Sequence, residues 1–300
     1  MEHLYPKCKD QYGKFTSPYI FRGESRKYSD VASLFYREFL CKTDHKPHEE
    51  PQNIELTLID NFQKYASYIP EYRGFGFWEW MMIARHYELP TRLMDFSSSP
   101  LTALYNSTKD VACQDSPEDD GIVWTLNMTI IRESRHFLPA SISKILKDKD
   151  RKQLTVKMLT ELGLDSFEGL EERSGQRPGE SVPLIIDPPT LDPRIMHQFG
   201  CFLCFSDRKT TFNGWLSKLI CSDNADDLLH QVTKNPCKLD HGHNSELKLP
   251  LFRIFVIKRN AKREIFDKLH MSNITPRILS PGLEGIAKTL HQRYSIIERK

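Results

Sequence analysis

Residues 86–100, with the sequence HYELPTRLMDFSSSP, decide much of how this chain folds and what it can bind. The stretch holds a His, a Thr, an Arg, an Asp and three Ser between two strongly apolar, helix-forming segments. Polar groups at such density cost free energy on burial unless they pair with one another or with a ligand. One interpretation is a self-satisfied turn, in which Arg92 bridges Asp95 and the Ser side chains cap the following helix. The other is a binding site, and both stay open at this point.

The segments around this stretch predict several helices. Their apolar residues recur at a spacing of three to four, which is the period of an amphipathic helix. Proline suits the first turn of a helix, so a further helix should begin at Pro100. The predicted helices are residues 31–39, 54–68, 77–87, 260–270 and 283–293, and the one that begins at Pro100.

Short apolar runs predict the strands, at residues 18–23, 121–126, 201–205 and 249–257. The last two are so apolar that we expect both in the core of a sheet and not at an edge that faces water. Residues 132–185 are charge-dense and helix-prone, and they predict a helical insertion. The fold class is therefore α+β, a single domain over residues 1–300 with a mixed or antiparallel β core and an N-terminal helical group.

Charge and composition exclude some classes of protein. The 300 residues include 42 Lys or Arg and 40 Asp or Glu, a net charge of +2, which excludes a simple polycationic nucleic-acid binder but not a local basic face. No stretch approaches the roughly 20 apolar residues that cross a bilayer. The first 15 residues lack the apolar segment of a secretory signal, and the seven cysteines are an odd number. We therefore expect a cytoplasmic protein with reduced thiols and no membrane contact.

A second polar element, the triplet Phe21-Arg22-Gly23, ends the first predicted strand. Together with residues 86–100 it makes the chain resemble the FRG domain family, which is named for this triplet. That family has a downstream His-Tyr-Gly-x-Pro-Thr-Arg-Leu-Leu-Asp segment, and here Glu88 stands where Gly is usual. Later matches to the family are Arg194, Gln198-x-Gly200-x-Phe202, Ile274-Thr275 and Pro281-x-Leu283-Glu284-Gly285.

The order of polar residues also resembles the ADP-ribosyltransferases of the Arg–Ser–Glu type. Those enzymes have an aromatic-Arg pair at the end of the first strand, a Ser-Thr-Ser-like segment before a helix, and a late Glu. Here the corresponding residues are Arg22, Ser97 to Ser99 and Glu284, although the middle Ser98 replaces Thr and the usual Glu- or Gln-x-Glu pattern is missing. The resemblance implies a fold like that of these transferases, with NAD as the substrate.

The implied function is an NAD-consuming or ADP-ribosyl-transferring enzyme, a toxin or an anti-phage effector, whose acceptor is a protein or a nucleic acid. Glu284 would be the catalytic carboxylate, since a carboxylate stabilises the oxocarbenium-like state of glycosidic cleavage. Arg22 and Arg92 would hold phosphates, because guanidinium groups bind them bidentately. The other implied contacts with NAD are Gly23, His86, Thr91, Asp95, Ser97, Ser98 and Ser99.

Two other functions remain open. The same polar residues could form a non-catalytic module that binds a nucleotide or another anion and signals to a partner. A nuclease that uses His86 and Asp95 is the third class, although no second pair of His and acid supports it.

We expect no metal site. Cys201-x-x-Cys204 lies within an apolar strand and has no second pair, so packing in the core explains it. The residues Cys221, Cys237, His241 and His243 match no standard zinc spacing.

Overall fold

The computed structural model describes residues 17–26, 31–40, 51–112, 119–133, 138–149, 153–174, 181–191, 193–220 and 251–295. Within these ranges, seven strands form one sheet in the order β4-β5-β6-β2-β1-β3-β7. Neighbouring strands are antiparallel, except that β4 and β5 are parallel. The strands are β1 (Tyr19–Glu24), β2 (Met94–Ser97), β3 (Gly121–Asn127), β4 (Leu154–Thr155), β5 (Pro183–Asp187), β6 (Gly200–Phe205) and β7 (Phe252–Ile257). The prediction of an α+β fold is confirmed.

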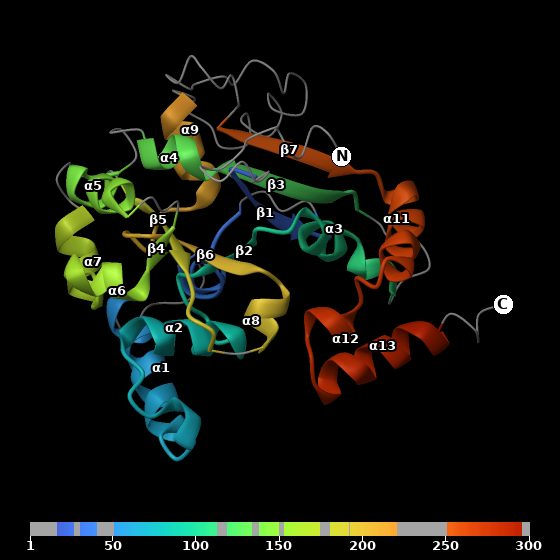
Figure 1. Ribbon diagram of the computed structural model, residues 1–300, viewed down its shortest axis with the longest axis horizontal. Helices are drawn as coiled ribbons and strands as arrows, with labels where there is room; N and C mark the ends of the chain where they lie inside the picture. Colours follow the sequence, from blue (N-terminus) through green and yellow to red (C-terminus); the bar gives the residue numbers. More distant parts are fainter. Residues whose placement is uncertain are drawn as a thin grey trace.

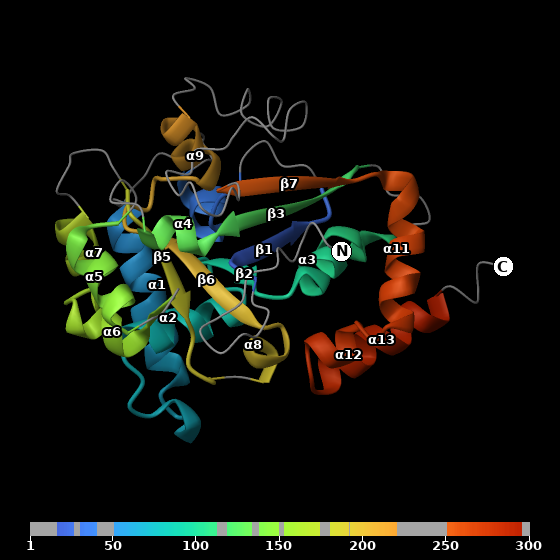
Figure 2. The same cartoon turned by 45° about the horizontal axis from the view of Figure 1, so that its top comes forward.

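Helices cover the sheet and gather at its two ends. Figures 1 and 2 show α5, α6 and α7 beside β4 and β5, whereas α11, α12 and α13 lie at the other end. Between them, α3 packs on β1 and β3 and also contacts α11. The helices are α1 (Pro51–Ala66), α2 (Phe77–His86), α3 (Pro100–Thr108), α4 (Met128–Glu133), α5 (Ala140–Asp148), α6 (Val156–Glu161), α7 (Phe167–Ser174), α8 (Pro193–His197), α9 (Phe212–Ile220), α11 (Arg259–Met271), α12 (Pro276–Leu279) and α13 (Leu283–Ser295). Three short helices of other types are Tyr36–Leu40, Pro70–Tyr72 and Lys109–Ala112.

Helix α2 contributes the aromatic and Met side chains of the main core. Trp78, Met81 and Ile83 are almost completely buried there. The indole Nε1 of Trp78 donates a hydrogen bond to the carbonyl of Leu164, at 2.7 Å, so this ring is satisfied inside the protein.

Within the described residues, none of the helices combines the length and apolar character that crossing a bilayer requires.

Strand β1 and helix α3 approach each other closely at Gly23. A Cβ atom at this position would lie only 1.7 Å from the carbonyl oxygen of Ala103, so any other residue would force the helix away. The FRG triplet therefore ends on a residue that sets the distance between the sheet and α3.

Strand β7 corrects one expectation from the sequence. It lies at an edge of the sheet as far as the structure describes the chain, so the expectation of a core strand at residues 249–257 is wrong. Its apolar run has a different cause, because side chains on each face of the strand pack against neighbours, while Val256 is 37% exposed. Ile254 packs against the main core, whereas Phe255 and Ile257 pack on the face that holds α3.

The sequence analysis missed three strands, which are β2, β4 and β5. β2 lies within residues 86–100, where we expected only irregular structure and a turn, and it pairs with both β1 and β6. β5 lies at the end of the predicted helical insertion. Residues 132–185 thus contain α5, α6 and α7, but they also contribute two strands to the common sheet.

Candidate functional site

Arg92 forms a buried ion pair with Glu55 of α1. The two side chains are only 2% and 1% exposed, and Arg92 Nη2 lies 2.7 Å from Glu55 Oε2. Arg92 also donates from Nη1 to the carbonyl of Ser206, at 3.0 Å, and its guanidinium lies 4.7 Å from the ring centroid of Phe167. The bridge to Asp95 that one interpretation assumed is therefore wrong. While the pair is closed, a phosphate cannot reach this guanidinium.

Arg22 lies close to Asp95 on the adjacent strand. Its Nη1 donates to the backbone carbonyl of Asp95 at 2.8 Å, and its Nε donates to Glu24 at 3.0 Å. The carboxylate of Asp95 is half exposed and accepts a hydrogen bond from Nε of Arg85, at 3.0 Å. Asp95 is thus paired with Arg85 and not with Arg92.

The three consecutive serines have different environments. Ser97 is buried, and its hydroxyl donates to the carbonyl of Gln198 at 2.6 Å. Ser99 caps α3, since its hydroxyl accepts from the N–H of Thr102 at 3.4 Å, which confirms the capping interpretation for this residue. The side chain of Ser98 is exposed, and its backbone N–H donates to the carbonyl of Phe199 at 2.9 Å. Ser98 is therefore the one that solvent reaches most easily.

Thr91 and His86 lie away from this turn. Thr91 is completely buried, and its hydroxyl accepts a hydrogen bond from the N–H of Leu93 at 3.4 Å. His86 ends α2 and is half-buried, with its ring packed edge-on against Tyr87 at 5.1 Å between centroids. Neither contact brings these side chains to Ser98.

Glu284 lies in the first turn of α13 and is exposed. Its carboxylate accepts a hydrogen bond from Lys288, one turn later, at 2.6 Å. Exposed pairs of this kind are worth only about 0.3–0.5 kcal/mol, so the contact with Lys288 by itself adds little to stability.

Lys109 lies near several of the charged residues of this region. Solvent reaches its side chain, yet its pKa is lowered, first because the protein surrounds the ammonium group and then because of the positive charge of Lys288. Arg22 adds to this lowering, and the carboxylates of Asp95 and Glu88 oppose it. Charges shift a pKa only from nearby, so Lys288, Arg22, Asp95 and Glu88 each lie in the neighbourhood of Lys109.

The sequence analysis missed Lys109 and Lys288. Lys288 follows Glu284 by one helical turn, so that spacing could have indicated it. No sequence signal marks Lys109, because its neighbours come from distant parts of the chain. Lys288, the partner of Glu284, lies near Lys109, and so does Arg22.

Two residues beside these groups have strained backbones. Phe199 has φ of +49°, which is rare for a bulky side chain, and its ring is 64% exposed. Its neighbour Gln198 donates from Nε2 to the carbonyl of Leu279 at 2.9 Å, which joins the serine turn to α12. Glu88 has φ of +65° and ends the turn after α2, so the family's usual Gly has a conformational reason there.

The cysteines of β6 show no sign of reactivity. Cys201 and Cys204 are free and buried, and burial raises the pKa of both thiols, that of Cys204 to about 12. Over the ranges that the structure describes, no group of His, Cys, Asp and Glu side chains could hold a metal ion. The zinc residues considered above, Cys221, Cys237, His241 and His243, lie outside those ranges.

The geometry can be compared with known families. Residues 17–116 match the family model of the FRG domain. The matched range includes Arg22, Gly23, the whole of residues 86–100 and Lys109, but Glu284 and Phe199 lie beyond it. Neither a curated protein nor a solved structure matches the chain. Since the triplet and the downstream segment lie on adjacent strands within the matched range, we conclude that this chain carries an FRG domain at residues 17–116.

Proposed function

We propose that this FRG domain protein binds NAD beside Arg22 and transfers or releases its ADP-ribosyl group. The observation that supports the proposal is that Lys288 and Arg22 both lie near enough to Lys109 to lower its pKa, while Glu284 pairs with Lys288. Positive charges around Lys109 suit a pyrophosphate. Burial is the first cause of the lowered pKa of Lys109, and repulsion by Lys288 and Arg22 adds to it. A bound dianion would relieve that repulsion.

The other groups would bind the rest of the substrate. The exposed hydroxyl of Ser98 would contact the ribose beside the nicotinamide, and the exposed ring of Phe199 would stack on a base or on the nicotinamide. Arg92 would act through the fold alone, since its buried pair with Glu55 fixes the segment that leads into β2.

The proposed reaction breaks the bond between the ribose C1′ and the nicotinamide nitrogen. Nicotinamide leaves with the bonding electron pair, and the acceptor supplies a new pair to C1′ and loses a proton. The carboxylate of Glu284, once released from Lys288, would stabilise the positive charge that develops on the sugar. Water, a protein side chain or a nucleic acid could be the acceptor, and depletion of NAD would make the protein a toxin or an anti-phage effector.

The test is release of nicotinamide from NAD by the purified protein. We expect Glu284→Gln to reduce the rate at least about 100-fold with an unchanged thermal unfolding temperature. Glu264→Gln is the matched control, because Glu264 forms the same kind of exposed pair with Lys268 on α11. Equal rates in the two variants would remove Glu284 from the mechanism.

A non-catalytic nucleotide-binding module is the second candidate. It is favoured by the position of Glu284, which is exposed, paired with Lys288 and outside the matched FRG range. This candidate predicts that NAD and ADP-ribose bind to the wild-type protein and not to Arg22→Gln, while no nicotinamide is released. Calorimetry on both variants, together with the nicotinamide assay, separates the two functions.

A further inference from the structure

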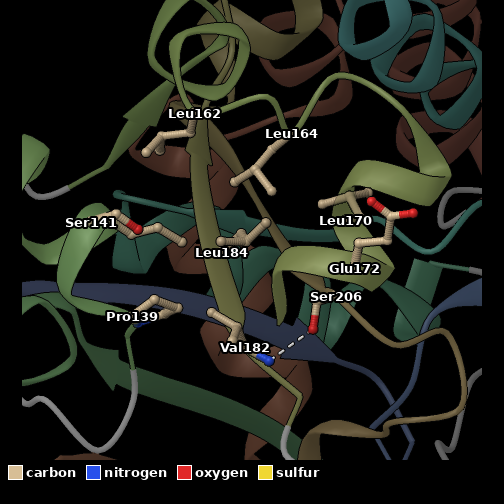
Figure 3. Close-up of a pocket in the computed structure, with 10 residues that line it drawn as sticks. Pro139, Ser141, Leu162, Leu164, Leu170, Glu172, Val182, Leu184 and Ser206 are labelled. Atoms are coloured by element: carbon tan, nitrogen blue, oxygen red, sulfur yellow. Dashed lines mark hydrogen bonds between the residues drawn. The ribbon is translucent and has the colours of Figure 1, made fainter. Parts of the chain in front are cut away.

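A cavity of about 290 Å³ lies over β5 (Figure 3). Neither Arg22 nor Glu284 is among its lining residues. Helix α5, the loop between α6 and α7, and α7 form its walls. Its size is close to the lower limit of sites that hold small organic molecules. The lining residues are Pro139, Ser141, Ile142, Leu162, Leu164, Leu170, Glu172, Val182, Leu184 and Ser206.

The walls of this cavity are mostly apolar and well buried. Leu164, Leu170 and Leu184 are each at most 3% exposed. An engineered apolar cavity of about 150 Å³ binds benzene, so a space about twice as large can hold a bicyclic aromatic body. Burial of such a body is favoured by roughly 25 cal/mol for each Å² of apolar surface removed from water.

Two polar side chains lie on opposite sides of the space, with Leu184 between them (Figure 3). Ser141 belongs to α5 and Glu172 to α7, and both are exposed. Among the residues that the structure describes, Glu172 has neither a hydrogen bond nor an ion pair, so its charge is available. Ser206 differs, because its hydroxyl already accepts from the N–H of Val182 at 2.9 Å.

We propose that this cavity binds a small amphipathic amine, with an aromatic or branched aliphatic body between the leucines and a protonated amino group on Glu172. The negative charge of Glu172 favours a positively charged ligand, and the apolar walls favour a ligand with an apolar body. A neutral aromatic molecule of the same size would fill the walls but leave the carboxylate unpaired.

The walls of the cavity also hold the FRG domain in place. The carbonyl of Leu164 accepts from Trp78 at 2.7 Å, and the carbonyl of Ser206 accepts from Arg92 at 3.0 Å. A ligand that orders these walls would therefore stabilise the packing of residues 162–206 on the FRG domain, and its binding does not depend on NAD.

Tryptamine and tryptophol are the probes, since they differ only in an ammonium group against a hydroxyl on the same indole body. We expect calorimetry and ligand-observed NMR to show that the full chain binds tryptamine about five-fold more tightly than tryptophol, the factor for a charge pair worth about 1 kcal/mol. Glu172→Gln should make the two affinities equal. The control Glu168→Gln, one turn earlier on α7 and not part of the lining, should leave the five-fold difference intact.

Ser141→Trp tests the location. Ser141 is exposed, so the larger side chain can cover the cavity without entering the core, and we expect it to abolish binding of both probes while thermal unfolding is unchanged. Undiminished binding to this variant would overturn the assignment of the cavity. Failure of the wild-type chain to bind either probe at millimolar concentration, or equal affinities for both, would overturn the proposed ligand class.

Discussion

Glu55 and Arg92, 37 residues apart in the chain, form an ion pair in which both side chains are almost completely buried. The carboxylate accepts from Nε and Nη2 of Arg92 and also from its backbone N–H, at 3.0 Å. The Glu55 carboxylate thus accepts hydrogen bonds from both the side chain and the backbone of Arg92. The pair joins α1 to the segment before β2.

Glu55→Gln should lower the free energy of unfolding by about 3–5 kcal/mol, because it leaves the charge of Arg92 buried without a counter-charge. Urea unfolding measures the change. The double variant Glu55→Leu/Arg92→Met should recover most of the loss, since apolar replacements of a buried pair are often neutral. Glu161→Gln, which removes an exposed pair with Lys149, should have a much smaller effect. If Glu55→Gln costs no more than Glu161→Gln, the buried pair does not stabilise the fold.

Gly23→Ala should destabilise the protein by about 1–3 kcal/mol or more, because the new Cβ would clash with the backbone of Ala103. Thermal unfolding should show the loss as a lower midpoint. Gly76→Ala is the control, since a Cβ there meets only the side-chain oxygen of Glu79, at 3.0 Å. An unchanged midpoint for Gly23→Ala would mean that α3 can move away from β1 freely.

Phe199→Gly should raise the free energy of unfolding by about 1 kcal/mol, because Gly adopts positive φ without strain and the exposed ring makes few contacts. If Phe199 stacks on NAD as proposed, the same variant should weaken NAD binding by about 1–3 kcal/mol. Chemical unfolding and calorimetry measure the two effects. If the variant is more stable but binds NAD more weakly, Phe199 is a binding residue and not a packing residue.

Glu88→Gly provides the comparison for that experiment. It also relieves the strain of a side chain at positive φ, so it should be stabilising by a similar amount. Glu88 makes no ring contact with a ligand in the proposed site, so the large loss of affinity should be specific to Phe199→Gly. Loss of stability in both variants would show that the backbone at these positions is not strained.

The lowered pKa of Lys109 predicts how stability depends on pH. The unfolded chain, with a pKa near 10.5, holds its proton more tightly than the folded one. Between the folded pKa and 10.5 the unfolded state therefore binds more protons, and this residue's contribution to stability rises with pH. The wild-type protein should gain stability relative to Lys109→Gln as the pH increases through that window. Urea unfolding of both proteins at several alkaline pH values tests this, and a constant difference would contradict it.

Some of the fold could be predicted from local sequence pattern. The helices α1, α2, α3, α11 and α13 each have an apolar period that depends on the helix alone, and Pro100 marks the beginning of α3. β2 was missed because it is only four residues long and lies in a polar stretch. The edge position of β7 was missed because an apolar run reports that both faces are covered, but not how many neighbouring strands there are.

The candidate site was less accessible to prediction from the sequence. The resemblance to the FRG family indicated Arg22, Arg92 and Asp95, but it gave no information on the residues that pair with them. The carboxylate next to Arg92 comes from α1, which has no motif, and Asp95 pairs with Arg85 of α2. Likewise, the surroundings of Lys109 depend on how α13 lies against α3, where Gln292 donates to the hydroxyl of Tyr105 at 3.4 Å, and this is a property of the tertiary fold.

The position of β1 and β2 in the middle of the sheet affects whether the FRG domain can fold without the rest of the chain. Each of these strands forms one of its two ladders with a strand beyond residue 116, β1 with β3 and β2 with β6. A fragment cut at the end of the matched range would leave two unsatisfied strand edges and an orphaned indole at Trp78, and unpaired edges of this kind associate with other chains. In this protein, the FRG domain at residues 17–116 thus needs the later strands in order to fold, and its excision should yield aggregates.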